Sequence, residues 1–314
     1  MGIIIKSIEY KLPENSEDIS DLAEEFTPWK IDEIYEKTGV KKRYIAKKDE
    51  TALDLTLIAC SKILKIHPRE TIDGIIFCTQ SPDYIIPANS FLLHKELNLR
   101  NDIFNFDFNH ACSGYIYSLI FAEAFLSQKI AKKILLINAD TYSKYIAPHD
   151  RSTRSLFGDA SAVSVIQYEN NNSGIIDYSF HTDGSDYKSF WIPNGGSRNP
   201  LKQDGKTVNP EIEMNGMNVW SFINAIVPKQ IDNLLKKNGL SHKDIDHYIF
   251  HQSSLLSINS LIKIMNLDKN KVTINLNEVG NTVSASIPIA LKSPIKSKNI
   301  KEGSKVVLAG FGAG

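Results

Sequence analysis

Hydrophobic and polar residues follow two patterns along the chain, and these predict strands and helices in turn. Apolar runs predict buried strands at residues 1–10, 72–78, 133–138, 163–168, 174–182, 245–251 and 305–309. Amphipathic stretches predict helices at residues 18–37, 49–64, 88–97, 217–237 and 254–265, and residues 276–291 are predicted to form a strand, a turn and a helix. This alternation of strands and helices predicts an α/β fold with largely parallel, buried sheets.

The two halves of the chain resemble each other in sequence. Residues 72–77 are matched by residues 245–250, 173 positions later, and residues 134–136 by residues 306–308, 172 positions later. A duplicated α/β unit explains both offsets, and chance similarity between short apolar strands is the alternative. We therefore predict an N-terminal half at residues 1–172 and a C-terminal half at residues 173–314. Packing of the halves about a pseudo-twofold axis would bring together Cys112, His251 and Asn281.

Cys112 lies in a turn between a predicted strand, residues 102–108, and a predicted helix that starts at Ser113. A cysteine at the first turn of a helix lies near unpaired N–H groups and the positive end of the helix dipole. Both favour the thiolate, which is the nucleophilic form. The same N–H groups can bind an oxyanion. The alternative is a buried structural cysteine, because free cysteine is among the most buried residue types.

His251 and Asn281 complete a set of residues that can support nucleophilic catalysis. A histidine exchanges protons near neutral pH, and an asparagine amide donates N–H groups to a developing negative charge. Each residue also has a structural interpretation. His251 ends a strand, where its ring can bond a loop carbonyl, and Asn281 follows a glycine and can be a turn residue.

Composition narrows the class of protein. Of the 314 residues, 42% are hydrophobic and 23% charged, and the formal net charge is zero, which disfavours nucleic acid as a partner. No apolar run predicts a membrane span, and the first ten residues do not read as a signal peptide. The three cysteines, Cys60, Cys78 and Cys112, show no metal-binding spacing. They favour a reducing, cytoplasmic location without disulfides or a metal site.

In its motifs the sequence resembles the thiolase superfamily, and within it the β-ketoacyl-acyl carrier protein synthase III group. The matching motifs follow the family's order over nearly the whole chain: Thr38-Gly39-Val40, Arg43, Ala111-Cys112-Ser113-Gly114, Asp150-Arg151, Phe157-Gly158-Asp159, Asp183-Gly184-Ser185, His251-Gln252, Gly280-Asn281-Thr282, Ser284-Ala285-Ser286 and Phe311-Gly312.

The resemblance implies a thiolase-like five-layered αβαβα fold from a duplicated α/β unit, and a homodimer. It implies that Cys112 takes an acyl group from a coenzyme A or acyl-carrier-protein thioester. His251 and Asn281 then stabilise the enolate formed when a malonyl-type thioester loses CO2, and a Claisen condensation gives a 3-oxoacyl product. The oxyanion hole is formed by the backbone N–H groups of Cys112 and Ala313. The resemblance implies no metal and no bound organic cofactor.

The resemblance also assigns substrate binding to five residues, listed here: Lys37, Arg151, Ile86, Gly216 and Ser254. Ile86 precedes Pro87 where some members have a phenylalanine that caps the acyl pocket, and this smaller side chain is compatible with a longer or branched acyl chain. Ser254 stands where the family has asparagine, and Leu256 where it has a basic residue that helps dock the carrier protein. Glu33 occupies the position of the family's adenine-stacking tryptophan, with Trp29 four residues earlier.

These departures favour a specialised acyl-thioester condensing enzyme, and they leave two alternatives. One is an acyltransferase that moves the acyl group from Cys112 to an alcohol or amine without decarboxylation. The other is a non-catalytic partner subunit of a homologous synthase. The family pattern also continues beyond the loop around Ala313 into one more strand, so the chain is either truncated or lacks that strand.

Overall fold

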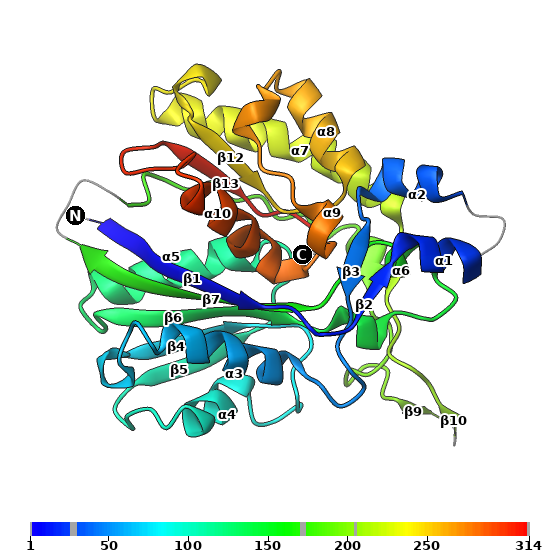
Figure 1. Cartoon of the computed structure of the whole chain (residues 1–314), viewed down its shortest axis with the longest axis horizontal. Helices are drawn as coiled ribbons and strands as arrows, with labels where there is room; N and C mark the ends of the chain where they lie inside the picture. The colour runs from blue at the N-terminus through cyan, green and yellow to red at the C-terminus, as the bar shows by residue number, and fades with distance from the viewer. Residues whose placement is uncertain (1, 26–29, 170–173, 204–205, 313–314) are drawn as a thin grey trace.

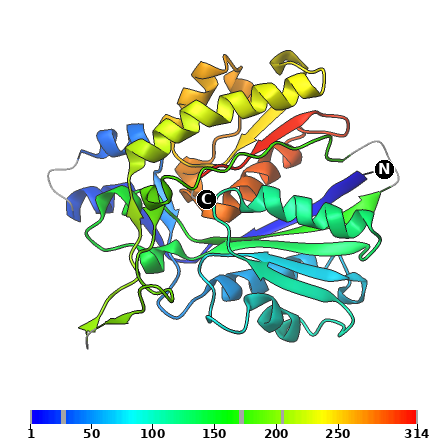
Figure 2. The same ribbon diagram turned by 180° about the vertical axis from the view of Figure 1, so that it is seen from behind.

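Two main sheets alternate with three layers of helices in the computed structural model, which describes residues 2–25, 30–169, 174–203 and 206–312 (Figure 1). Helices α3 and α4 cover the outer face of the larger sheet. Helices α5 and α10 lie between the two sheets, and α7 and α8 cover the outer face of the smaller sheet (Figures 1 and 2). The layers therefore run α-β-α-β-α, as the resemblance implied.

The larger sheet has the strand order β1-β7-β6-β4-β5, and the smaller one pairs β12 with β13. Strands β4, β5 and β6 are parallel to one another, whereas β7 is antiparallel to both β1 and β6. The expectation of largely parallel sheets is thus correct for the central strands and wrong at the β1–β7 edge. The main strands are β1 (Gly2–Lys11), β4 (Gly74–Cys78), β5 (Phe104–Phe108), β6 (Lys133–Asp140), β7 (Ala160–Glu169), β12 (His247–Phe250) and β13 (Val306–Ala309). The short strands are β2 (Ser16–Asp18), β3 (Lys42–Tyr44), β8 (Phe190–Trp191), β9 (Lys202–Gln203), β10 (Lys206–Thr207) and β11 (Glu213–Met214).

The helices bury apolar faces against these sheets. The α-helices are α1 (Ile19–Glu25), α2 (Ile31–Thr38), α3 (Ala52–Ile63), α4 (Asn89–Glu96), α5 (Gly114–Ser127), α6 (Arg151–Arg154), α7 (Gly216–Lys237), α8 (Leu255–Ile264), α9 (Leu276–Val279) and α10 (Ser286–Lys296). A reciprocal capping box between Thr51 and Asp54 starts α3, because each side chain accepts a hydrogen bond from the other residue's backbone N–H.

The internal repeat seen in the sequence reappears in strand register. In the larger sheet Gly74 of β4 lies opposite Ile134 of β6, and in the smaller sheet His247 of β12 lies opposite Val306 of β13. Both pairs are parallel. Gly74 and His247 are related by the offset of 173 positions, and Ile134 and Val306 by the offset of 172. The predicted boundary at residue 172 falls in 170–173, outside the described residues, so the division into halves stays a prediction.

Three predicted elements differ in the structure. Residues 174–182 form no strand; Ile176 and Phe180 are exposed, so the segment lacks the buried face that a strand needs. Residues 276–279 form the short helix α9 rather than a strand, with Leu276 and Val279 buried at helical spacing. The helix expected at residues 18–37 is two helices, α1 and α2.

Candidate active site

Cys112, His251 and Asn281 line one cavity of about 580 Å³. Cys112 follows β5 in the N-terminal part of the chain, His251 follows β12, and Asn281 follows α9. The packing of the two sheets on α5 and α10 therefore brings together three side chains from distant parts of the sequence. The sequence prediction that these residues meet is confirmed.

Cys112 is buried just before the first residue of α5, Gly114. The loop after β13 packs directly against it. A Cβ atom on Gly312 would lie 2.7 Å from the Cys112 Sγ, and one on Gly310 would lie 2.7 Å from the Ser113 Cα. Only glycine allows the loop to approach the sulfur this closely. Ala313, the second predicted oxyanion-hole residue, lies outside the described residues.

His251 is held on both its backbone and its ring. Its N–H donates to the Ala309 carbonyl at 2.8 Å, which extends the pairing of β12 with β13. Its Nδ1 lies 2.7 Å from the Ser286 Oγ, and its ring packs edge-on against Phe311. Burial lowers the pKa of His251 from its ordinary value of 6.5 to about 3, so the ring is neutral at physiological pH.

Asn281 is fixed by its own backbone and by its amide oxygen. Its N–H donates to the Leu156 carbonyl at 2.9 Å, and its carbonyl accepts from Gly158 N–H at 3.0 Å. The Asn281 Oδ1 accepts from the Val283 N–H at 3.0 Å. This bond orients the amide, because it leaves the Nδ2 group to face His251 and the Ser253 carbonyl.

The side chains of His251 and Asn281 present two donors to the same point. Ser286 Oγ accepts from the Gln252 N–H at 3.5 Å, so its own proton is available for His251 Nδ1. When the Ser286 hydroxyl donates this proton to Nδ1, the ring's own proton is on Nε2, which lies 3.5 Å from the Asn281 Nδ2. Two N–H donors at this separation do not satisfy each other. They can both bind one oxygen that enters the cavity, and they bind it best when it is negatively charged.

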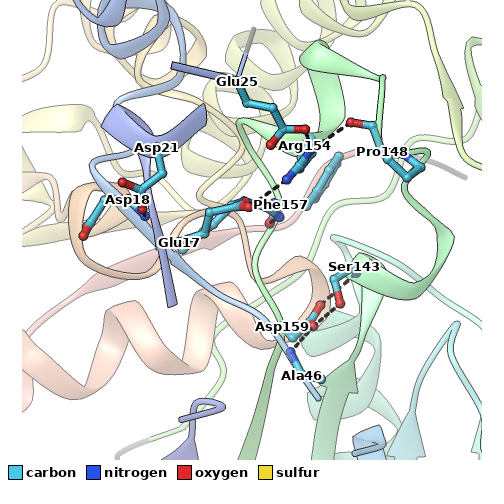
Figure 3. A network of polar contacts seen from close by, with 11 residues as sticks. Glu17, Asp18, Asp21, Glu25, Ala46, Ser143, Pro148, Arg154, Phe157 and Asp159 are labelled. Carbon is cyan, nitrogen blue, oxygen red and sulfur yellow. Dashed lines mark hydrogen bonds and ion pairs between the residues drawn. The ribbon is translucent and has the colours of Figure 1, made fainter. Parts of the chain in front are cut away.

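A partly buried ionic cluster supports the segment that pairs with Asn281 (Figure 3). Arg43 donates to the Phe157 carbonyl at 3.0 Å and forms an ion pair with Glu17. Arg154 forms ion pairs with the same Glu17 at 2.9 Å and with Glu25 at 2.6 Å. Glu17 thus joins two arginines, one of which holds Phe157 next to the Asn281 bridge.

Asp159 anchors the other end of this segment (Figure 3). Its carboxylate accepts from the Ala46 N–H at 2.8 Å and the Ser143 N–H at 2.9 Å. Burial raises the pKa of Asp159, and these hydrogen bonds oppose the shift. The Phe157-Gly158-Asp159 motif therefore connects the α1 and β2 region to the loop after β6.

The predicted substrate-binding residues divide into two groups. Lys37, Gly216 and Ser254 line the cavity with the catalytic candidates, as do Glu33 and Leu256. Arg151 does not line it; Ser152 of α6 and Ser155, which follows α6, do, while Arg151 borders a separate hollow with His149 and Pro193. Ile86 is also absent from the cavity lining of its own chain, and it is 84% exposed. Trp29 lies outside the described residues.

Comparisons with known proteins agree on one family. Residues 106–184 match the family model described as 3-oxoacyl-[acyl-carrier-protein] synthase III, and residues 235–314 match the model of its C-terminal part. A β-ketoacyl-[acyl-carrier-protein] synthase III from Syntrophomonas wolfei is 34% identical over 100% of this chain and 95% of its own length. This chain belongs to the β-ketoacyl-acyl carrier protein synthase III family.

Solved structures of other synthases III have the same fold. A crystal structure of a 3-oxoacyl-(acyl-carrier-protein) synthase III matches with a TM-score of 0.94 and 32% identity, covering 99% of this chain and 96% of the other. The synthase III of Thermus thermophilus matches with a TM-score of 0.89 and 30% identity, covering 100% and 96%. Family membership makes this chain a condensing enzyme.

Among its described residues no helix is long and apolar enough to cross a membrane.

Sequence reasoning missed several residues of this synthase's site. Ser286 was part of a recognised motif, but its contact with His251 spans 35 positions of sequence and has no local signal. Phe311 packs on the His251 ring, and Phe157 and Phe190 line the cavity near Cys112. Phe157 and Phe311 also stood in recognised motifs, but a motif does not reveal which side chain an aromatic ring contacts.

Proposed function

We propose that this synthase uses Cys112 as its nucleophile and His251 with Asn281 as its enolate-binding pair, in a decarboxylative Claisen condensation. The observation that carries the proposal is the 3.5 Å separation of His251 Nε2 and Asn281 Nδ2 in the cavity that also holds Cys112. A nucleophile and a pair of converging donors at one cavity are what the two half-reactions require.

In the first half-reaction the Cys112 thiolate attacks the carbonyl carbon of an acyl thioester. A carbon–sulfur bond forms to Cys112, the bond to the donor's sulfur breaks, and the released thiolate takes up a proton. The positive end of α5 favours the attacking thiolate. The backbone N–H of Cys112 donates to the oxyanion, with the Ala313 N–H as the proposed second donor.

In the second half-reaction a malonyl-type thioester occupies the cavity in place of the first donor. Its carboxylate leaves as CO2, and the electron pair of the broken bond passes into an enolate. The enolate oxygen accepts from His251 Nε2 and Asn281 Nδ2. Its carbon then attacks the acyl carbonyl on Cys112, which forms the new carbon–carbon bond and releases the Cys112 thiolate. These two donors bind the enolate more strongly than the neutral thioester, so they lower the barrier to decarboxylation.

The low pKa of His251 suits this role. Because burial keeps the ring neutral, it acts as a fixed hydrogen-bond donor and not as a charged acid. A neutral donor in a buried site needs no reorganisation when charge develops on the substrate.

We assign one thioester to acyl carrier protein, which the names of the relatives contain, and the other to coenzyme A, which the family resemblance implied. The cavity reaches the surface, because its lining includes both the buried Cys112 and the exposed Lys37 and Glu33. Lys37 supplies a positive charge for a phosphate at the mouth. Leu256 gives α8 an exposed apolar side chain at the same opening. We propose no metal and no bound cofactor, because each bond change above uses only the substrates and this chain's residues.

We further propose a homodimer in the cytoplasm. Tyr84, Ile85 and Ile86 in the loop before α4 and Phe91 in its first turn have exposed apolar side chains, and Ile85 is 92% exposed. Adjacent exposed apolar side chains of this kind are typical of a protein interface. Ile86 would then contact the partner and could reach the partner's acyl site, which explains why it lies outside the cavity of its own chain.

The proposal is tested by mass spectrometry of the intact protein after incubation with acyl-coenzyme A. We expect the mass to rise by one acyl group, and no rise in Cys112→Ala. Asn281→Ala should still become acylated but should release CO2 from malonyl thioester at least about a hundredfold more slowly. Acylation without CO2 release in the wild type would favour acyl transfer to an alcohol or amine, and no acylation at all would favour a non-catalytic subunit.

A further inference from the structure

The turn between Asn281 and α10 has a strained backbone. Val283 has a φ angle of 52°, in the left-handed region that β-branched residues rarely adopt, and its side chain is fully buried. Such a conformation persists only where the surrounding contacts impose it, and residues of this kind cluster at active sites.

Val283 differs from the other non-glycine residues with positive φ. Among the described residues these are Asn98, Lys129, Asn266 and Lys298. Each of the four lies two residues after a helix ends and is exposed, as in the usual left-handed cap of a helix. Val283 instead lies in the buried turn that leads into α10. The cause of its conformation is therefore to be found in the contacts around this turn.

The strained turn orients the Asn281 amide. The Val283 N–H donates to the Asn281 Oδ1 at 3.0 Å, and the amide Nδ2 then faces His251 and the Ser253 carbonyl. A small rotation of the turn would move the Val283 N–H and release the amide oxygen. The amide could then flip and turn its oxygen, in place of its N–H donors, toward the enolate. Condensation therefore depends on how firmly this turn is held.

Asp140 holds the turn from the end of β6. It is fully buried, and its Oδ2 accepts a hydrogen bond from the Ser284 Oγ at 2.6 Å. Ser284 is the residue after Val283 and lies in the same buried turn. The Asp140 Oδ1 accepts from the N–H of Gln80, in the loop after β4, at 2.8 Å. The carboxylate thus attaches the turn to the carboxyl ends of two central strands of the larger sheet.

The bond from Ser284 to Asp140 is suited to holding a strained turn. A hydrogen bond to an ionised group is roughly twice as strong as one between neutral groups. Burial raises the pKa of Asp140 to about 7, and the hydrogen bonds from Gln80 and Ser284 oppose the rise. The carboxylate is therefore the main form in weakly alkaline solution. Because a buried charge without donors is costly, the carboxylate keeps its contact with Ser284.

We propose that Asp140 is a positioning residue for the condensation step: through Ser284 it holds the strained turn that orients the Asn281 amide. Asp140, Val283 and Ser284 do not line the cavity, so they act on the substrate only through Asn281. The inference rests on the proposed role of Asn281 in binding the enolate. Acylation of Cys112 does not use the Asn281 amide, so the two half-reactions should respond differently to loss of Asp140.

The test is a double-mutant cycle in weakly alkaline buffer that combines Asp140→Asn with Asn281→Ala. Release of CO2 from malonyl thioester reports condensation, and intact mass after incubation with acyl-coenzyme A thioesters reports acylation of Cys112. Asp140→Asn alone should slow CO2 release about tenfold or more, since a small misplacement of a catalytic group has effects of this size. Acylation should change little. In the Asn281→Ala background the same substitution should cause no further loss, because the group that it positions is absent.

Two further variants accompany the cycle. Ser284→Ala breaks the same bond from the side of the turn. It should reproduce the effect of Asp140→Asn, and it takes the place of that variant if Asp140→Asn does not fold. Asp107→Asn is the matched control, because Asp107 is a part-buried carboxylate that accepts from the Asn89 and Ser90 N–H groups at the start of α4. Its ratio of CO2 release to acylation should equal that of wild type.

Unchanged CO2 release in Asp140→Asn and Ser284→Ala would overturn the inference, and so would equal slowing of the two half-reactions. A loss from Asp140→Asn in the Asn281→Ala background as large as that in wild type would also overturn it, because Asp140 would then act by another route. Undiminished CO2 release in Asn281→Ala, by contrast, would overturn the proposed function itself.

Discussion

The Ser286 Oγ lies 2.7 Å from the Nδ1 of His251, where a hydroxyl can set which ring nitrogen carries the proton. A hydroxyl proton on Nδ1 places the ring's own proton on Nε2, beside the Asn281 amide. Without Ser286 the ring is free to adopt the other tautomer, in which Nε2 has no proton and its lone pair would repel an enolate oxygen.

Ser286→Ala is therefore expected to slow decarboxylation of malonyl thioester about tenfold, the equivalent of one lost hydrogen bond. Acylation of Cys112 should change little, because His251 acts in the second half-reaction. Both rates can be measured on one preparation, by CO2 release and by intact mass. Ser164→Ala, which removes a buried hydroxyl bonded to Tyr115, is the control and should change neither. Equal loss of both rates in Ser286→Ala would contradict a tautomer role.

Gly312 allows the last described loop to touch the nucleophile. In Gly312→Ala the new Cβ would lie 2.7 Å from the Cys112 Sγ, closer than non-bonded atoms allow. We expect acylation to slow about a hundredfold, since small misplacement of a reacting group costs this much. Gly184→Ala is the control, because a Cβ there meets no atom within 4 Å. Normal acylation in Gly312→Ala would mean that the loop is not packed on the sulfur as described.

Glu17 is expected to matter for both stability and condensation. Glu17→Gln leaves Arg43, whose side chain is 5% exposed, without its carboxylate partner. The free energy of unfolding should fall by about 1–3 kcal/mol, the cost of leaving a buried polar group poorly paired. Because Arg43 also holds the Phe157 carbonyl, CO2 release should fall more than acylation.

Glu25→Gln is the matched control for this cluster. It removes an ion pair with the same Arg154, but the Glu25 side chain is 50% exposed. Exposed pairs contribute at most about 1 kcal/mol, so denaturant unfolding should shift little and the ratio of the two rates should stay unchanged. Equal effects of the two substitutions would show that Glu17 has no special role.

The buried, neutral His251 makes stability depend on pH. Its folded-state pKa of about 3 is below the ordinary value of 6.5, so the unfolded chain binds a proton that the folded chain does not. Stability from this group is fully present above pH 6.5 and is lost as the pH falls toward 3. Urea unfolding midpoints at several pH values in this window should therefore fall less steeply in His251→Asn than in wild type. Parallel curves would contradict a depressed pKa.

Local patterns in the sequence determined most of the elements. The apolar runs at β4, β6, β12 and β13 marked these strands, and two offsets of nearly equal length indicated that β12 and β13 repeat β4 and β6. These features can be recognised in the sequence because burial of a strand or of one helix face makes apolar residues recur at a short, fixed spacing. The same patterns gave wrong predictions at residues 174–182, where burial is weaker, and at α9, which is short. Motif order identified Cys112, His251 and Asn281 through resemblance to a family.

Only the tertiary structure decided how these residues are supported. Ser286 on His251, Glu17 between two arginines, and Asp140 on Ser284 are contacts between residues far apart in the chain. It also excluded Arg151 and Ile86 from the cavity of this chain. Such contacts leave no periodic signal, because they depend on how whole layers pack and on which side chains then share a space. The sequence by itself determined which groups can react, and the packing of the two sheets on α5 and α10 determined where they meet.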